Sequence, residues 1–181
     1  MTRSEFLVEL LESDAREVAR WPASLEEVRL WAGSAGGWPI DTSVYRRWHA
    51  EPDVKPYVLR DGEATVGYGE LWTDEAEQEV ELARIIVDLD YRGRGVGKRL
   101  VCMLLERASV TSLPDTFVRV IPENGAAIAC YVGAGFSPVP EKEREEFNSG
   151  QPVDYVWMHY PLGRIIRHYG RWWDHTVPRG G

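Results

Sequence analysis

The stretch Val87-Asp-Leu-Asp-Tyr-Arg-Gly-Arg-Gly-Val-Gly-Lys98 decides the fold of this chain. An apolar run, Val80–Val87, leads into it, and the apolar residues of Val96–Ala108 then recur at helical spacing. The pattern predicts a strand, a glycine-rich turn and an amphipathic helix. Such a turn directs backbone N–H groups and the positive end of the helix dipole toward one place, so the sequence predicts an anion site there.

The composition of the turn supports an anion ligand but excludes two common phosphate motifs. Its glycines let the backbone approach a ligand closely: Gly93, Gly95 and Gly97. Basic residues stand among and after them, in a chain of net charge −8: Arg92, Arg94, Lys98 and Arg99. A P-loop is excluded because Arg92 occupies its first glycine position and Arg99 its Ser or Thr position. The GxGxxG dinucleotide motif fails because Lys98 stands at its third glycine.

The rest of the chain alternates strand and helix patterns. The predicted strands are Phe6–Leu11, Pro56–Leu59, Ala64–Trp72, Val80–Val87, Thr116–Ile121 and Asp154–Tyr160. The predicted helices are two short ones with Asp14 and Ser24 as N-caps, then Asp41–His49, Val96–Ala108 and Ala126–Val132. Gly33–Pro39 has the composition of a loop. This order predicts an α/β fold with mixed strand directions over residues 1–162, and residues 163–181 as a C-terminal helical extension and tail.

Composition bounds the function. Hydrophobic residues make up 44% of the chain and charged residues 28%, as in folded soluble proteins. No apolar run approaches the roughly 20 residues that cross a bilayer, and the N-terminus lacks a signal peptide, so no membrane role and a cytoplasmic location are expected. Cys102 and Cys130 form no CxxC pair or Cys/His cluster, so no metal is expected. The acidic charge argues against nucleic acid as a partner.

The pattern (Arg/Gln)-x-x-Gly-x-(Gly/Ala), here Arg92-Gly-Arg-Gly95-Val-Gly97, resembles the coenzyme A signature of the GNAT superfamily, the Gcn5-related N-acetyltransferases. The likeness extends to Asn124-x-Ala-Ala-x-x-x-Tyr131-x-x-x-Gly135-Phe136 and covers roughly Val54 to Tyr160. It implies the GNAT fold, whose mostly antiparallel sheet of about six to seven strands is splayed at its centre and flanked by helices. It also implies acetyl-CoA as cosubstrate, with the diphosphate held by Arg92, Gly93, Arg94, Gly95, Val96, Gly97 and Lys98.

The same resemblance implies roles near the thioester. The backbone of Ile85, Ile86 and Val87 matches the splayed strand that bonds the acetyl oxygen and the pantetheine arm, and such donors polarise a carbonyl. Tyr131 resembles the general acid that protonates the departing thiolate. Asn124 resembles a residue that bonds the coenzyme arm, a role compatible with an N-cap.

The general base has two candidates. Glu81 interrupts an apolar strand at the place of the base in the histone-acetylating branch of the superfamily, and Glu70 on the preceding strand is its rival. Each also fits an outward-facing strand residue. In the ribosomal-protein-acetylating branch the base lies on the next strand, where this chain has Arg119, so that mechanism does not transfer.

The resemblance therefore implies an N-acetyltransferase that acts by direct attack of a primary amine on acetyl-CoA. The acidic charge and the aromatic N-terminal region favour a small cationic amine. A protein or peptide acceptor, and a coenzyme A-binding module without catalysis, are the alternatives. The aromatic residues either line the acceptor pocket or pack a core: Trp21, Trp31, Trp38, Tyr45 and Trp48. The Trp172-Trp173 pair is expected to dock either on the domain itself or on a second subunit, and the second case predicts a homodimer.

Overall fold

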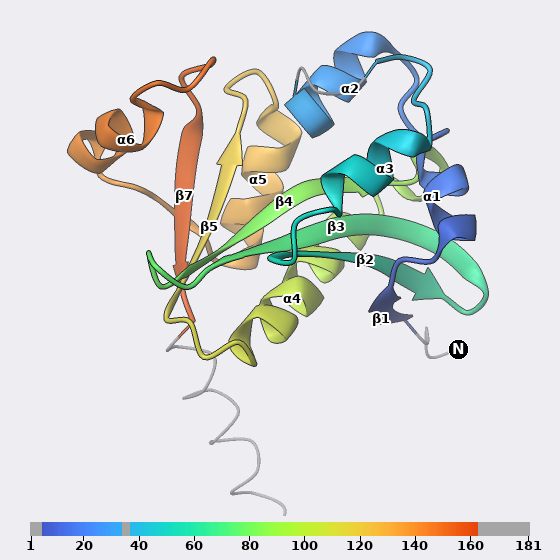
Figure 1. Ribbon diagram of the computed structural model, residues 1–181, viewed down its shortest axis with the longest axis horizontal. Coiled ribbons are helices and arrows are strands. Elements are labelled where there is room, and N and C mark those ends of the chain that lie inside the picture. The colour runs from blue at the N-terminus through green and yellow to red at the C-terminus, as the bar shows by residue number, and fades with distance from the viewer. Residues whose placement is uncertain (1–4, 34–36, 163–181) are drawn as a thin grey trace, which may run out of the picture.

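The computed structural model describes residues 5–33 and 37–162, which form one seven-stranded sheet with helices on both faces (Figure 1). The strand order is β1-β2-β3-β4-β5-β7-β6. The strands are β1 (Glu5–Glu9), β2 (Val54–Asp61), β3 (Ala64–Asp74), β4 (Glu79–Val87), β5 (Asp115–Val120), β6 (Ser137–Pro138) and β7 (Val156–Pro161). The helices are α1 (Glu12–Val18), α2 (Leu25–Ala32), α3 (Ser43–Trp48), α4 (Val96–Ser109), α5 (Gly125–Ala134) and α6 (Glu141–Asn148).

The predicted mixed, mostly antiparallel sheet is confirmed. Every strand pair is antiparallel except β4 with β5, which are parallel. The pairing of β4 with β5 covers only Glu79–Glu81 opposite Asp115–Phe117, and Figure 1 shows the two strands separating beyond it. The sheet is thus splayed at its centre, as the GNAT fold requires. The opening runs toward the C-terminal end of β4, where the glycine-rich turn begins.

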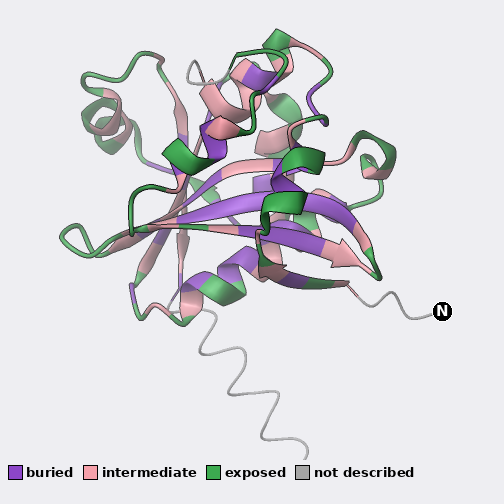
Figure 2. Cartoon of the chain, turned by 45° about the vertical axis from the view of Figure 1, so that its right-hand side comes forward, coloured by how far each residue is buried: buried purple, intermediate pink, exposed green. Residues whose placement is uncertain are grey.

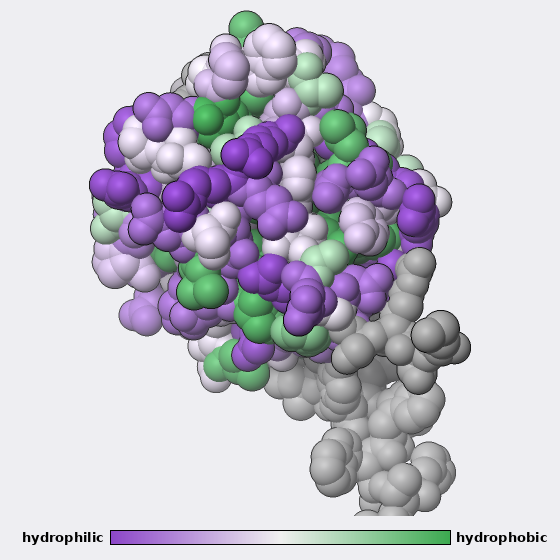
Figure 3. Space-filling view, turned by 90° about the vertical axis from the view of Figure 1, so that its right-hand side faces the viewer, coloured by the Kyte–Doolittle hydropathy of each residue, from purple (hydrophilic) through white to green (hydrophobic). Residues whose placement is uncertain are grey.

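Two apolar cores cover the two faces of the sheet. Side chains alternate along β2, so Leu59 joins the core beneath α4 and α5, whereas Val58 joins the core beneath α1, α2 and α3. Figure 2 shows the buried residues running along the middle strands of the sheet. Figure 3 shows one side of the molecule, whose surface is mainly hydrophilic with scattered hydrophobic residues. Trp21, Trp48 and Tyr45 are buried in the second core, while Trp38 is 51% exposed.

The helix starts test the predicted caps. Ser24 accepts a hydrogen bond of 3.2 Å from the backbone of Glu27, so its prediction as N-cap of α2 is confirmed. The prediction for Asp14 is wrong, because α1 begins at Glu12 and Asp14 is the third residue of the helix, within its first turn. Its carboxylate accepts the Leu11 backbone N–H at 2.9 Å and pairs with Arg60 at 2.7 Å, which the local sequence does not reveal.

Two further elements were absent from the prediction, namely the short β6 and the highly charged helix α6. The predicted extension over residues 163–181 and its Trp172-Trp173 pair lie outside the described residues. Among the residues that are described, none belongs to a helix with the length and apolar character needed to span a membrane.

Candidate active site

The glycine-rich turn opens α4 with three closely placed glycines. Gly93 and Gly95 have φ of 72° and 76°, the left-handed region that favours glycine, and Gly95 is the N-cap of α4. A Cβ on Gly97 would lie 3.4 Å from the Cys130 sulfur, so α4 and α5 approach each other closely at this residue. The turn therefore leaves the backbone N–H groups at the start of a fourteen-residue helix open to a ligand.

A cavity of about 650 Å³ lies beside this turn, between α4, α5, α2 and the end of β4. It brings together most of the predicted site residues: Ile85, Ile86, Val87, Arg92, Gly93, Gly95, Val96, Gly97, Lys98, Asn124 and Tyr131. Arg94 is not part of its lining; its guanidinium lies 5.8 Å from the centre of the Tyr91 ring. We call this the cofactor cavity.

The basic residues around the turn differ in how they are engaged. Arg92 pairs with Glu27 of α2 at 2.6 Å and donates to the Val87 carbonyl at 3.0 Å. Arg99 is held by Glu5 of β1. Lys98 lines the cofactor cavity and has no ion pair within the described part of the chain. Lys98 is therefore the basic side chain most available to an anion at this place.

A β-bulge in β4 lies beyond the last residue that pairs with β5. The register of β3 with β4 shifts between Tyr68 and Glu70, and Arg84 on the bulged strand has φ of 46°. The Trp31 indole donates a hydrogen bond of 2.6 Å to the Arg84 carbonyl. The bulge turns the strand so that the Arg84 side chain faces away from the cofactor cavity while Ile85, next along the chain, lines it.

Tyr131 lies on α5, is 7% exposed and lines the cofactor cavity. Burial raises the pKa of its phenol well above the usual value, so the hydroxyl keeps its proton at physiological pH. The hydroxyl makes no hydrogen bond to any residue that the structure describes. At the start of the same helix the Asn124 side chain accepts the Ala127 backbone N–H at 3.2 Å, which confirms it as an N-cap.

A second cavity, of about 290 Å³, lies in the opening on the other side of the bulge, and we call it the acceptor cavity. Glu81 of β4 and Arg119 of β5 line it and form an ion pair at 2.9 Å. Burial raises the pKa of Glu81 to about 7, although the charge of Arg119 acts in the opposite direction. Leu30 and Trp31 of α2 line both cavities, so the two spaces adjoin.

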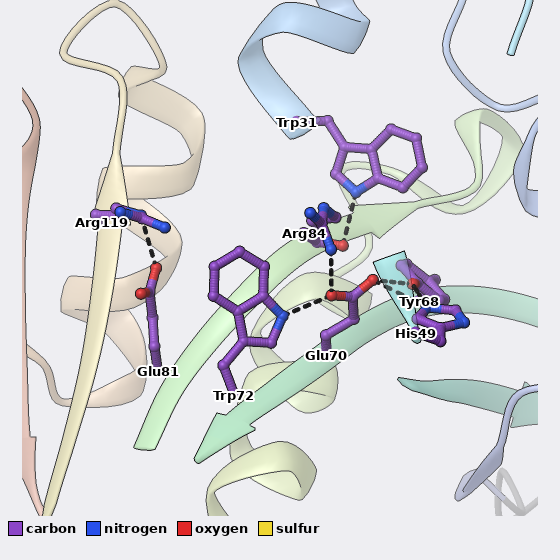
Figure 4. A network of polar contacts seen from close by, with 8 residues as sticks. All are labelled: Trp31, His49, Tyr68, Glu70, Trp72, Glu81, Arg84 and Arg119. Carbon is purple, nitrogen blue, oxygen red and sulfur yellow. Dashed lines mark hydrogen bonds and ion pairs between the residues drawn. The ribbon is translucent and has the colours of Figure 1, made fainter. Parts of the chain in front are cut away.

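Glu70, the rival base, lies in neither cavity lining. It is fully buried on β3, and Figure 4 shows donors around both of its oxygens. Trp72 and Arg84 donate to one oxygen at 2.6 and 2.7 Å, and the Tyr68 hydroxyl donates to the other, which also lies 3.2 Å from His49 Nε2. Burial favours a raised pKa for Glu70, but these partners outweigh it and lower the pKa. The carboxylate is saturated.

Sequence reasoning missed several lining residues. Glu27 and Leu30 of α2 line the cofactor cavity. In the sequence Glu27 has only the capping-box spacing from Ser24, and neither residue belongs to a cofactor-binding motif. Cys130 also lines that cavity, and burial raises the pKa of its thiol, which keeps it in the unreactive protonated form. Arg84 lines the acceptor cavity, but in the sequence it stands within a predicted strand and nothing marks it as a site residue.

Comparison with known proteins agrees with this geometry. The profile of the acetyltransferase (GNAT) family matches residues 11–136, so the chain belongs to this family. It is 28% identical over 123 residues to a mycothiol acetyltransferase of Corynebacterium glutamicum strain R, a match that covers 66% of this chain and 41% of that protein. The chain thus spans less than half the length of this curated relative.

Solved structures of the family share the fold. The spermidine N-acetyltransferase of Vibrio cholerae, in complex with CoA and spermine, superposes with a TM-score of 0.71 at 17% identity, over 90% of this chain and 98% of that one. The aminoglycoside acetyltransferase AAC(6')-Ib, in complex with coenzyme A, gives 0.70 at 19% identity, over 92% of this chain and 99% of that one. At these identities the likeness establishes the fold.

Proposed function

We propose that this protein is an acetyl-CoA-dependent N-acetyltransferase that acetylates a primary amine by direct attack. The observation that carries the proposal is the pair of adjoining cavities at the opening of the sheet. The cofactor cavity ends at Tyr131, a phenol that keeps its proton, and the acceptor cavity contains Glu81, a carboxyl with a pKa of about 7. A phenol that keeps its proton and a carboxyl that titrates near neutral pH, on two sides of one opening, suit acyl transfer.

The described residues fit acetyl-CoA. The glycine turn at the start of α4 and Lys98 suit a diphosphate, because helix N-termini and cationic side chains bind such anions. Backbone groups of Ile85–Val87, on the strand that has left its parallel neighbour, suit the amide-containing arm and the acetyl oxygen. The volume of about 650 Å³ lies in the range of small-molecule sites. The ligand supplies an acetyl thioester.

The chemistry assigns one proton transfer to each side chain. The protonated amine gives up a proton through Glu81, its nitrogen forms a bond to the acetyl carbon, and the carbon–sulfur bond breaks. Tyr131 donates a proton to the departing sulfur and regains one from the nitrogen. The products are an amide and a free thiol, and one proton is released to solvent. Glu70 has no free oxygen for this task and is left out of the catalytic set.

The second candidate is a coenzyme A-binding module without catalysis. Titration calorimetry with acetyl-CoA, followed by a thiol-release assay over a panel of polyamines, aminoglycosides, amino acids and lysine peptides, separates the two. Acetyl-CoA binding with thiol release in the presence of an amine supports the enzyme. Binding without release by any amine supports the module, and absence of binding rejects both.

A further inference from the structure

We infer that the acceptor amine also carries an oxyanion, a carboxylate or a phosphate, which Arg84 and Arg119 bind in the acceptor cavity. This inference rests on the proposed function and specifies its acceptor. It departs from the small cationic amine that the net charge of the whole chain favours, because the lining of the cavity has the opposite character.

The charged residues that line the acceptor cavity are mainly basic. They are Arg29, Arg84 and Arg119 against the single carboxylate of Glu81. Arg29 is partly exposed and engaged in two hydrogen bonds with Glu26, which is outside the cavity lining, so it contributes little. A polycation would meet one carboxylate, already paired with Arg119, and two partly buried guanidinium groups. The positive charges of these guanidinium groups repel the ammonium groups of a polyamine, so the cavity disfavours a polyamine.

Arg84 is held rigidly with donors to spare. Its guanidinium lies 4.2 Å from the centre of the Trp48 ring and 4.8 Å from that of Trp72, and one nitrogen donates to Glu70 (Figure 4). A guanidinium has five N–H donors, and this is the hydrogen bond that its side chain makes to the described residues. Its other donors are not among the buried side-chain atoms that lack a partner, so they are open to a ligand in the cavity. A planar oxyanion matches a guanidinium with two parallel hydrogen bonds.

Arg119 approaches the same space from β5. Its carbon Cζ lies 5.5 Å from the centre of the Trp72 ring, and Figure 4 shows this indole between the two arginines. Nε pairs with Glu81, and Nη1 has only a 3.5 Å contact to Gln151. When Glu81 accepts a proton from the amine, Arg119 loses its charge partner, and an oxyanion on the acceptor compensates for that loss. The arrangement therefore couples oxyanion binding to amine activation.

Size and wall chemistry limit the acceptor further. A volume of about 290 Å³ suits a single small molecule, at the lower end of ligand cavities. Trp31, Trp72 and Tyr155 provide aromatic wall. An amino acid or an amino sugar phosphate has the required combination of amine, oxyanion and compact body.

Matched acceptors isolate the oxyanion. We would measure kcat/KM for L-lysine against cadaverine, L-tyrosine against tyramine, and glucosamine 6-phosphate against glucosamine, since each pair differs only in the carboxylate or the phosphate. The expected result is a preference of about tenfold or more for the oxyanion member of at least one pair, as hydrogen bonds to a charged group provide. The amino acid pairs and the sugar pair distinguish carboxylate from phosphate. A preference for the decarboxylated or dephosphorylated members would overturn the inference.

Variants then test the residues. Arg119→Gln, and the double variant Glu70→Gln/Arg84→Gln that avoids an unpaired buried carboxylate, should reduce that preference about tenfold. The ratio within a pair is the readout, because a damaged base slows both members equally. Arg46→Gln, an 82% exposed arginine of α3, is the matched control and should leave the ratio unchanged. Unchanged ratios in both test variants would overturn the inference.

Acetyl-CoA binding is measured first by calorimetry, so that failure of the proposed function can be told apart from failure of this inference. A protein that does not bind acetyl-CoA refutes the proposed function. If the protein binds acetyl-CoA but no pair is acetylated, calorimetry of the CoA-saturated protein with the same pairs decides. Tighter binding of an oxyanion member, lost in Arg119→Gln, supports the inference. Binding without such a preference, or no binding of any member, overturns it.

Discussion

The indole N–H of Trp31 donates a 2.6 Å hydrogen bond to the carbonyl oxygen of Arg84, the residue at the β4 bulge. Trp31 lines both cavities, and the β4 residues before and after this point line different ones. The contact therefore attaches α2 to β4 at the boundary between the acceptor cavity and the cofactor cavity.

Carboxylates placed in the glycine turn should weaken cofactor binding. In the double variant Gly95→Glu/Gly97→Glu, the glutamate at position 95 must adopt a φ of 76°, which is strained for any residue with a side chain. The glutamate at position 97 enters the cofactor cavity, and both carboxylates repel a diphosphate. We expect the dissociation constant for acetyl-CoA to rise at least about tenfold by calorimetry. Gly62→Glu, at φ of 64° in the β2–β3 turn with open space around it, imposes similar strain and should bind normally. Normal binding by the double variant would refute the assigned site.

Tyr131→Phe removes the proposed acid and keeps the ring. We expect kcat to fall by about 10²–10⁴-fold while the dissociation constant of acetyl-CoA changes little, because the hydroxyl acts on the departing sulfur. Steady-state kinetics and calorimetry on the same preparation measure the two quantities. A variant that turns over at the wild-type rate would assign Tyr131 to packing against Phe136 instead.

The pH profile should report Glu81. A base must be deprotonated, so with a pKa of about 7 its activity should fall as the pH drops below 7 and level off above it. Arg119→Gln removes a positive charge that stabilises the carboxylate, so the limb should move to higher pH. We would compare kcat/KM for both proteins from about pH 5.5 to 8.5 with one acceptor, whose own ionisation is then common to both. Superimposable profiles would exclude Glu81 as the titrating group.

Glu70→Gln should act on stability before catalysis. The change leaves Arg84 unpaired in a buried site, and breaking such a pair costs about 3–5 kcal/mol of the free energy of unfolding. Urea unfolding measures the loss, with the exposed Glu75→Gln as control. If the variant keeps its stability but loses kcat, Glu70 regains its place as the candidate base.

Tyr45→Phe should stabilise the fold. The Tyr45 hydroxyl is buried without a hydrogen-bond partner among the described residues, so its removal relieves a desolvation cost. We expect the free energy of unfolding to rise by about 1 kcal/mol. Tyr68→Phe, whose hydroxyl donates to Glu70, should lower it. A loss of stability on Tyr45→Phe would show that the hydroxyl has a partner.

The sequence predicted the features that depend on a single segment of the chain, namely helix α4 with its glycine turn and two helix caps. The change of period at Val96 and the glycines of the turn identify α4 and its anion site, because dihedral freedom and amphipathicity are properties of the segment itself. Ser24 and Asn124 were found for the same reason. Helix α6 was missed because its sequence, EKEREEFN, has too few apolar residues to show a helical period.

The composition of the acceptor cavity depends on residues that are distant in the sequence. Trp31, Arg84 and Arg119 come from a helix and two strands, and only the bulge and the splayed sheet bring them together. Asp14 misled for a similar reason, since its strongest partner, Arg60, is 46 positions away. Glu70 and Glu81 both lie in strand-like stretches, so the sequence does not distinguish them. In the structure Glu70 is buried among four hydrogen-bond partners, whereas Glu81 lines a cavity.

The short pairing of β4 with β5 has a thermodynamic consequence. Along the parted edges, main-chain N–H and C=O groups have no facing strand within the described residues. Side chains satisfy some of them, as Trp31 does for the Arg84 carbonyl, and water must satisfy the others when no ligand is bound. A ligand that bonds them binds the native chain and not the unfolded one. At a thousand times its dissociation constant, such a ligand adds about 4.1 kcal/mol to the free energy of unfolding. The melting temperature of the protein therefore also reports what fraction of the molecules has a ligand bound in the gap between β4 and β5.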